Sequence, residues 1–174
     1  MVSFNIIYPF KYIEIVEKYS EEYDLAASLV FAVIHAESRF RPDAVSKKGA
    51  GGLMQIAEIT ADWAANELPL TDFNGADIFD PEINIKIGCW YLSKLNKQFG
   101  GVTETVLAAY NAGSGNVSSW LKDDRYSDDG RVLRFIPFGE TRLYIKKVND
   151  NVPIYEFMHG ARNAALKFFE RFGQ

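Results

Sequence analysis

The longest apolar stretch of the sequence runs from Leu25 to Ala36 and is interrupted only by Ser28 and His35. It spans twelve residues, whereas a helix needs about 20 apolar residues to cross a bilayer, so the stretch is too short for a membrane span. It instead predicts a buried helix that stops before Pro42. Other apolar elements must therefore cover this segment.

The rest of the chain also has apolar residues at helical spacing, and convincing alternating strands are absent. Helices are predicted over residues 12–23, 25–36, 81–99, 103–110, 116–121, 140–149 and 154–172, and over a segment that ends at 63. Asp24 is expected to cap the second of these helices, and Asp80 with Pro81 to begin the helix over 81–99. In the last helix, inward-facing positions are expected at Phe157, Ala161, Ala165, Phe168 and Phe172. The predicted fold class is therefore mostly α-helical, with functional loops between the helices.

Length and composition predict one domain over residues 1–174 that needs no disulfides or structural metals to be stable. A chain of 174 residues buries roughly 70% of the surface of its unfolded form, which is enough for a full core. Cys89 is the only cysteine and is expected to fill the core. The two histidines lie far apart in the sequence and make no zinc pattern, so no metal or cofactor is predicted.

The charge balance argues against nucleic acid as a partner. The 19 basic and 23 acidic residues give a net charge of −4, and no long Lys/Arg cluster offsets it. The N-terminal segment lacks the pattern of a signal peptide, and its abrupt start is compatible with a membrane anchor that is missing from these residues.

Glu37 directly follows the apolar run, within the last turns of its helix. Apolar neighbours and the negative end of the helix dipole both disfavour a carboxylate there, so the acid could stay protonated near neutral pH and donate a proton. Arg39 and Arg41 would oppose this effect if their side chains point inward. A solvated glutamate at a helix end is the commoner case, and the burial pattern alone favours that alternative.

Two other segments suit contact with a polar ligand. The glycine-rich turn over 49–52 fits neither a Walker loop nor a dinucleotide fingerprint, and a plain turn also explains it. Tyr110 and Asn111 stand at a predicted helix end before Gly113, where a phenol and an amide suit hydrogen bonding to a sugar. Helix capping alone would also explain Asn111.

Four segments form an ordered set along the chain. They are Glu37-Ser38-Arg39-Phe40-Arg41-Pro42, the stretch from Ala44 to Gln55, Ala109-Tyr110-Asn111-Ala112-Gly113, and Glu140-Thr141-Arg142-Leu143-Tyr144. Together they closely resemble the soluble lytic transglycosylase family, over a core of about residues 8–152 that is followed by the predicted helix over 154–172. Four ordered motifs rarely coincide by chance, and the resemblance reverses the preference on Glu37. Glu58, where the family usually has proline, departs from its pattern.

The resemblance implies a lysozyme-like helical fold with a substrate groove. Members of that family cleave the β-1,4 bond between N-acetylmuramic acid and N-acetylglucosamine in peptidoglycan, and they form a 1,6-anhydro sugar instead of adding water. By that likeness Glu37 is the sole catalytic acid/base, acting first on the departing oxygen and then on the muramoyl C6 hydroxyl. Ordinary glycosidases pair two carboxylates, and no second one is obvious in the sequence.

The resemblance also assigns substrate contacts in the glycine-rich segment. Ser46 and Gln55 would hydrogen-bond the sugars or their N-acetyl groups, and Met54 would form part of the groove wall. Without the family, ordinary capping of a turn and of a helix would explain Ser46 and Gln55.

The remaining implied contacts surround Glu37. Tyr110 and Asn111 would bind sugar near it, Tyr144 would support its carboxyl from across the cleft, and Glu140 would orient neighbouring groups. A charge that favours the start of a helix also explains Glu140.

Two other functions stay open beside the transglycosylase. A related fold can admit water and act as a muramidase-type hydrolase, and a non-catalytic module could hold peptidoglycan or take part in a secretion machine. Peptidoglycan glycan strands are the expected partner in each case. The expected location is outside the cytoplasmic membrane, in the cell wall or envelope, and the expected state is a monomer.

Overall fold

The computed structural model describes residues 7–70 and 73–172. The helices of this part are α2 (Ile13–Glu22), α3 (Ala27–Ser38), α4 (Glu58–Glu67), the 3₁₀ helix η1 (Gly75–Phe79), α5 (Pro81–Gln98), α6 (Thr103–Ala112), α7 (Ser114–Trp120) and α8 (Gly139–Phe172). Within the described residues, β-type pairing is limited to isolated bridges of Gly51 with Val45 and with Ile56. The mostly α-helical fold class is therefore confirmed.

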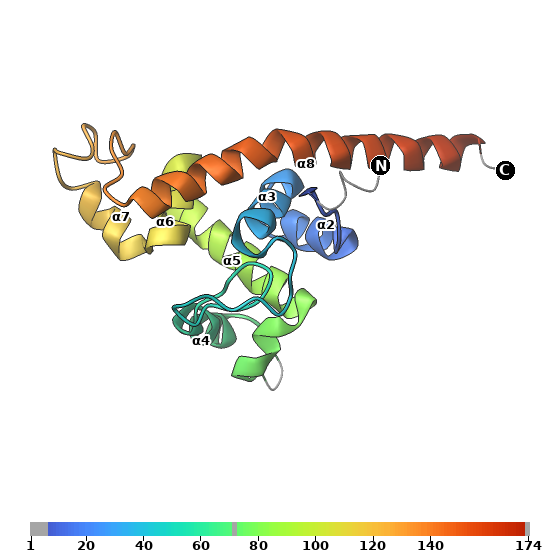
Figure 1. The fold of residues 1–174 in the computed structure, drawn as a ribbon, viewed down its shortest axis with the longest axis horizontal. Helices are drawn as coiled ribbons and strands as arrows, with labels where there is room; N and C mark the ends of the chain where they lie inside the picture. Colours follow the sequence, from blue (N-terminus) through green and yellow to red (C-terminus); the bar gives the residue numbers. More distant parts are fainter. Residues whose placement is uncertain (1–6, 71–72, 173–174) are drawn as a thin grey trace.

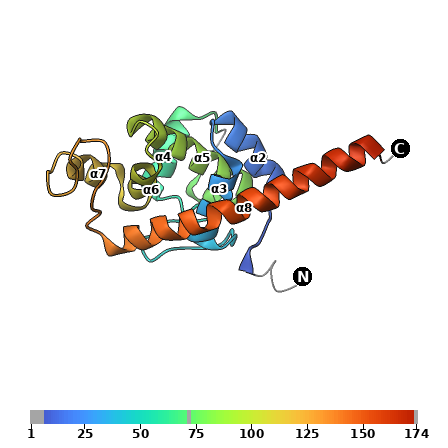
Figure 2. The ribbon, with the colours of Figure 1, turned by 90° about the horizontal axis from the view of Figure 1, so that it is seen from above.

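Helix α3 lies in the middle of the molecule and carries its most apolar segment. Val30, Phe31, Ala32, Val33 and Ile34 are all fully buried. Helix α8 runs across α3 and packs against it, as both views show (Figures 1 and 2). The buried helix that the apolar run predicts is confirmed, and none of the described helices is long and apolar enough to cross a membrane.

Helix α5 links the two ends of the fold, because it packs against α2, α4, η1 and α6. The Asp80 carboxylate accepts hydrogen bonds from the backbone N–H groups of Glu82 (2.9 Å) and Ile83 (3.0 Å), and Pro81 occupies the first turn. This capped start, which the sequence predicts, is confirmed.

The start of α3 differs from the predicted one. Asp24 does not cap α3: Ala26 is the N-cap residue, and Asp24 sits in the preceding turn with φ of 53°. Helix α4 begins at Glu58, five residues after Leu53. The intervening residues form a turn, because Ile56 and Gly51 exchange backbone hydrogen bonds of 2.9 and 3.0 Å.

Helix α8 is one continuous element where two helices were predicted, and Pro153 lies inside it. A proline in a helix removes one hydrogen bond and crowds the carbonyl four residues earlier, here that of Asn149. Both Pro153 and Asn149 are exposed, so water can satisfy that carbonyl. Val148 and Tyr155, on either side of the proline, are fully buried and hold both parts of the helix against the core.

The apolar stripe predicted to face inward in the last part of α8 is instead exposed. Phe157 and Phe168 are 76% and 59% exposed, and Ala161 and Ala165 are exposed as well. The end of α8 extends beyond the other helices, so no other helix of the described part of the chain covers the stripe there (Figures 1 and 2). The side chain of Phe172 lies outside the described residues.

A close contact between α5 and the loop before α4 fixes the distance between these elements. Gly88 has no side chain, and a Cβ atom there would lie 2.2 Å from the Met54 sulfur and 2.7 Å from its methyl carbon. Met54 is itself completely buried, and protein interiors are close-packed, so an added Cβ would crowd this contact.

We therefore expect Gly88→Ala to lower the free energy of unfolding by about 1–3 kcal/mol, because it overpacks the core at Met54. Gly115→Ala is the matched control, since a Cβ at Gly115 meets nothing within 4 Å, and it should change stability by less than about 1 kcal/mol. Chemical denaturation of both variants measures the difference. Equal stability of the two variants would contradict this account of the contact.

Candidate functional site

A cavity of about 520 Å³ opens between α3, α6, the start of α8 and the loop that follows α3. It is lined by Ala36, Glu37, Ser46, Gln55, Asn111, Glu140, Leu143, Tyr144 and Lys147. All four of the motif segments singled out in the sequence contribute to this lining, and only Ala36 and Lys147 lie outside them. The fold thus brings together residues that are up to about a hundred positions apart.

Glu37 lies in the last turn of α3, half-buried at the wall of this cavity. Desolvation raises the pKa of its carboxyl to about 7, and the negative charge of Glu140 adds to the rise. The Tyr144 hydroxyl and the Lys147 ammonium act in the opposite direction. A carboxyl with a pKa near 7 is present in both protonation states at neutral pH, as a group that gives and then takes a proton requires.

The two arginines that follow Glu37 do not oppose this rise. Arg39 is exposed at the C-cap of α3, and Arg41 Nε donates a hydrogen bond of 3.1 Å to the Ser38 carbonyl. Neither guanidinium lines the cavity that contains Glu37. The pKa of Glu37 is therefore set by burial, Tyr144, Glu140 and Lys147, and not by the two arginines.

Tyr144 and Tyr110 both lie close enough to Glu37 to interact with its charge. The Tyr144 hydroxyl is buried and has no geometric hydrogen-bond partner among the described residues, although it is near enough to Glu37 to lower its pKa. The Tyr110 hydroxyl donates to the Met54 carbonyl at 2.9 Å. Burial raises the pKa of both phenols, and the charge of Glu37 raises it further, so both stay neutral.

Asn111 is oriented by a residue that the sequence analysis did not single out. The hydroxyl of Thr141, which is 1% exposed, donates to Asn111 Oδ1 at 2.8 Å. This contact occupies the amide oxygen and leaves the amide N–H groups of Asn111 available to a ligand. Thr141 belongs to the quoted Glu140–Tyr144 motif, but only the packing of α6 on α8 pairs it with Asn111.

Ser46 and Gln55 line the cavity and also hold its loop together. Ser46 Oγ accepts hydrogen bonds from the backbone N–H groups of Lys48 (3.2 Å) and Ala50 (3.0 Å). Gln55 has φ of 50°, and its Nε2 donates to the carbonyls of Ala44 (3.0 Å) and Gly52 (2.8 Å). The capping alternative therefore describes the bonds that these side chains make. The amide oxygen of Gln55 remains as an acceptor for a ligand, and the O–H of Ser46 remains as a donor.

Met54 does not form part of the groove wall, in contrast to the expectation from the resemblance. Its side chain is 0% exposed and packs against Gly88, and it does not line the cavity. Its backbone N–H donates to Asn84 Oδ1 at 2.7 Å, and its carbonyl accepts from Tyr110. These two hydrogen bonds hold the Met54 backbone against α5 and α6. Met54 therefore fixes the position of its loop and of the Tyr110 side chain.

Lys147 and Leu143 are cavity residues that the sequence analysis missed. Lys147 follows Tyr144 by three positions and Glu140 by seven, which places all three on one face of α8. This spacing is the signal that could have identified it. Leu143 is 63% exposed, an unusual state for a large apolar side chain at the edge of a cavity.

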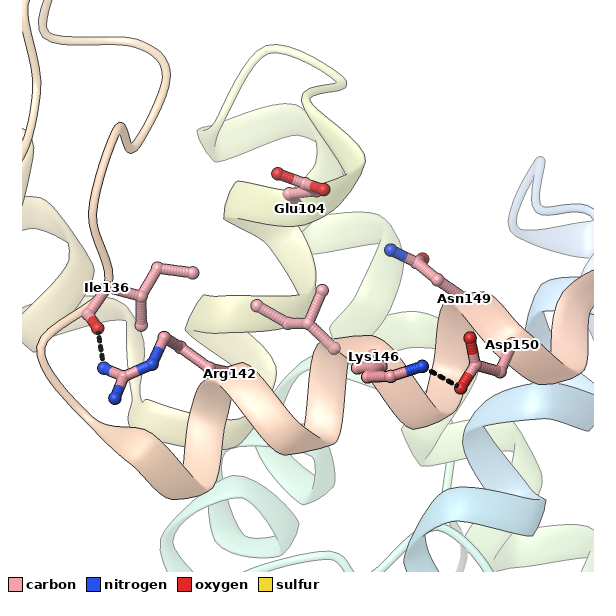
Figure 3. Close-up of a pocket in the computed structure, with 7 residues that line it drawn as sticks. Glu104, Ile136, Arg142, Lys146, Asn149 and Asp150 are labelled. Carbon is pink, nitrogen blue, oxygen red and sulfur yellow. Dashed lines mark hydrogen bonds and ion pairs between the residues drawn. The ribbon is translucent and has the colours of Figure 1, made fainter.

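A second cavity, of about 340 Å³, lies on another face of α8 and is lined in part by Glu104 at the start of α6 (Figure 3). Three of its charged side chains are engaged: Lys146 pairs with Asp150 at 2.7 Å, and Arg142 donates to the Ile136 carbonyl. Glu37 does not line this cavity, so it is a weaker candidate for proton transfer. The described residues also contain no cluster of His, Cys, Asp and Glu that could hold a metal.

We expect Tyr144→Phe to raise the pKa of Glu37 further above 7, because the Tyr144 hydroxyl lowers it in the wild type. A carboxyl titration of Glu37 followed by NMR measures the change. Tyr126→Phe, in the loop between α7 and α8, serves as the matched control and should leave the titration unaltered. An unchanged or lowered pKa in Tyr144→Phe would show that the hydroxyl does not act on the carboxyl.

The raised pKa of Glu37 also predicts how stability depends on pH. A carboxyl whose pKa is raised on folding, here from 4.5 to about 7, loses its stabilising contribution as the pH rises through that interval. We expect Glu37→Gln to match the wild type near pH 4 and to exceed it by on the order of 2 kcal/mol near pH 9. Denaturation curves at the two pH values test this, and a constant difference would contradict it.

Comparison with known proteins places these motifs in a family. The family model named "Transglycosylase SLT domain" matches residues 14–132. The soluble lytic murein transglycosylase of Salmonella typhimurium is 34% identical over 161 residues, which cover 91% of this chain and 25% of that protein. The membrane-bound lytic murein transglycosylase C of Edwardsiella ictaluri is 34% identical over 170 residues, and the match covers 83% of this chain and 46% of that protein.

Solved structures of lytic transglycosylases have the same fold as this chain. An inactive mutant of the lytic transglycosylase Slt from Pseudomonas aeruginosa, with glutamine in place of a glutamate, superposes with a TM-score of 0.78 at 34% identity, over 90% of this chain and 26% of that one. The 70 kDa soluble lytic transglycosylase of Escherichia coli gives 0.77 at 32% identity, over 88% and 25%. The lysozyme-like helical fold is thereby confirmed.

The chain spans only about a quarter of the length of the soluble relatives. Over most of its own length, however, both its sequence and its backbone follow theirs. From the matched family model and these relatives, we conclude that this chain belongs to the Transglycosylase SLT domain family.

Proposed function

We propose that this chain is the catalytic domain of a peptidoglycan lytic transglycosylase, with Glu37 as its single acid/base. The observation that carries the proposal is the pKa of about 7 of the Glu37 carboxyl at the wall of a large cavity. Membership of the family supports the choice of peptidoglycan, since the relatives are named murein transglycosylases. The inactive glutamate-to-glutamine mutant of the Pseudomonas aeruginosa enzyme supports an essential glutamate.

The proposed reaction uses the same carboxyl twice. Protonated Glu37 gives its proton to the oxygen of the β-1,4 bond as that bond to the muramoyl C1 breaks. The resulting carboxylate then takes the proton of the muramoyl C6 hydroxyl while this oxygen bonds to C1. The products are a 1,6-anhydro-muramoyl end and a free N-acetylglucosamine hydroxyl, and the glutamate is protonated again.

The neighbours of Glu37 suit both halves of this cycle. Desolvation and the charge of Glu140 favour the protonated acid that starts the reaction, whereas Tyr144 and Lys147 stabilise the carboxylate that follows. Opposing influences of this kind place the pKa near the working pH, where a general acid and base is most effective.

The polar groups that remain free in the cavity are proposed to bind sugar. They are the amide N–H groups of Asn111, the amide oxygen of Gln55 and the hydroxyl of Ser46, all at the wall of the same cavity. Tyr110 contributes by fixing the loop, because its hydroxyl is committed to the Met54 carbonyl. All of these groups come from one chain, so the proposed catalytic unit, residues 1–174, is a monomer.

A hydrolase of the muramidase type is the second candidate, and Glu140 is the observation that favours it. This exposed carboxylate lines the same cavity as Glu37, so a water molecule between them could be activated as in glycosidases that pair two carboxylates. In either case the substrate lies outside the cytoplasmic membrane, and we place the protein there, either free or held by an anchor.

We expect Glu37→Gln to lower turnover of purified wall glycan by at least about 100-fold, because it removes the only proposed proton carrier. Glu58→Gln, an exposed glutamate at the start of α4, is the matched control and should cleave at the wild-type rate. The masses of the products, measured by mass spectrometry, decide between the two reactions. Products heavier by one water would reject the transglycosylase, and equal turnover by Glu37→Gln and wild type would reject the mechanism.

A further inference from the structure

The last part of α8 carries an apolar stripe that no other helix of the described chain covers. Phe157, Ala161, Ala165 and Phe168 follow one another at spacings of three and four residues, so they share one face of the helix. Phe157 and Phe168 are 76% and 59% exposed, and both alanines are exposed as well. We call these four residues the α8 stripe. Figures 1 and 2 show that the end of α8 projects beyond the rest of the fold.

The stripe and its surroundings expose enough apolar surface to bind another molecule. Phe169, next to Phe168 on the helix, is 68% exposed, and the two rings lie 6.0 Å apart. A phenylalanine has roughly 200 Å² of surface, so Phe157, Phe168 and Phe169 together expose about 400 Å² of aromatic surface in each chain. Apolar patches of this size on a protein surface are often binding sites.

The charges of this segment favour a protein over a membrane as the partner. Residues 154–172 contain three cations and two anions, which are Arg162, Lys167, Arg171, Glu156 and Glu170. Arg162 is already paired with Glu17 at 2.9 Å. Helices that bind anionic membranes through an apolar face have a polar face rich in Lys and Arg. The mixed charges of α8 lack that pattern, and none of them lies in the stripe itself, as in the core of a protein interface.

The order of residues in the stripe fits a second copy of the same chain. Phenylalanine stands at both ends and alanine at the two positions between them, so the stripe has the same pattern in both directions. Two copies related by a two-fold axis can therefore pair antiparallel. Phe157 of each copy then lies against Phe168 of the other, and Ala161 lies against Ala165, where the small side chains let the helices approach closely.

An antiparallel pair also keeps the globular parts of the two molecules apart. The earlier part of α8 packs against α3 and α6, whereas the stripe lies near the other end of the helix (Figures 1 and 2). A parallel pair would place both globular parts at the same end. The phenylalanines of two copies expose about 800 Å² in total, and the alanines and flanking side chains extend the contact toward the roughly 1,200 Å² of a small stable interface.

We propose that two copies of this chain associate through the α8 stripe as an antiparallel dimer. No residue of the stripe lines the Glu37 cavity, so each chain keeps a complete candidate site and remains the catalytic unit. Lys147, at that cavity, precedes the centre of the stripe by about 16 residues, which is about 24 Å of helix. The dimer therefore holds two Glu37 cavities roughly 50 Å apart along the paired helices.

Analytical ultracentrifugation between about 1 and 100 µM measures the association, and we expect the wild type to dimerise in this range. Phe157→Glu should raise the Kd of the dimer at least about 100-fold, because the charge enters a symmetric interface twice. Ile59→Glu is the matched control, since it puts the same charge on an 80% exposed apolar residue of α4, and it should leave the Kd unchanged.

Phe168→Ala guards against a loss of helix in Phe157→Glu, because alanine favours the helix. It should raise the Kd at least about tenfold, and circular dichroism of both variants measures the helix content. If Phe157→Glu loses helix, the Kd of Phe168→Ala decides. A wild type that stays monomeric over the whole range, or variants that dimerise as well as the wild type, would overturn the proposal. Binding of a monomeric wild type to phosphatidylglycerol vesicles, abolished in Phe157→Glu, would assign the stripe to a membrane instead.

Spin labels attached to Glu170→Cys test the orientation of the two helices. Position 170 is exposed and lies outside the stripe, and the natural Cys89 is completely buried, so it is protected from the label. The antiparallel pair places the two labels about 20 Å apart along the axis, whereas a parallel pair places them about 10 Å apart. A distance near the shorter value would overturn the antiparallel arrangement.

Discussion

The crossing of α3 and α8 is the contact on which the candidate site depends. The middle of α3 is fully buried, and Val148 and Tyr155 of α8 are buried against the same core. This burial fixes the position of the last turn of α3, which carries Glu37 at the wall of the cavity. The carboxyl is held against Tyr144 of α8, and the loss of solvation raises its pKa. A core contact thus determines the protonation state of the group proposed to do the chemistry.

The opposite wall of the cavity is fixed by hydrogen bonds rather than by apolar packing. Asn84 of α5, which is completely buried, accepts from the Met54 N–H and donates to the carbonyls of Gly51 (3.1 Å) and Ile78 (2.7 Å). Gly52 has to be glycine at this point, since a Cβ there would lie 2.1 Å from the Asn84 amide. One buried amide therefore joins the glycine-rich loop to α5, so that Ser46 and Gln55 reach the cavity from a fixed backbone.

Sequence patterns predicted structure correctly where interactions within one segment determine it. They failed where packing between distant segments determines it. The apolar run of α3 and the Asp80–Pro81 start of α5 follow from burial and capping, and both were predicted correctly. The continuity of α8 across Pro153 depends on which side of the helix faces solvent, and no periodicity contains that information. The exposure of Phe157 has the same origin, because an apolar stripe is buried only where another element lies against it.

The sequence alone determined the helical fold class, because turn glycines, caps and apolar spacing are local properties of the chain. The resemblance to the family came from the residues of the four motifs. Only the tertiary structure decided what each motif residue does. It buried Met54, paired Thr141 with Asn111, brought Lys147 beside Glu37 and left Arg39 exposed at the C-cap of α3. Desolvation, charge proximity and hydrogen bonding act through space, so they are set by which distant segments the packing of α3, α5 and α8 brings into contact.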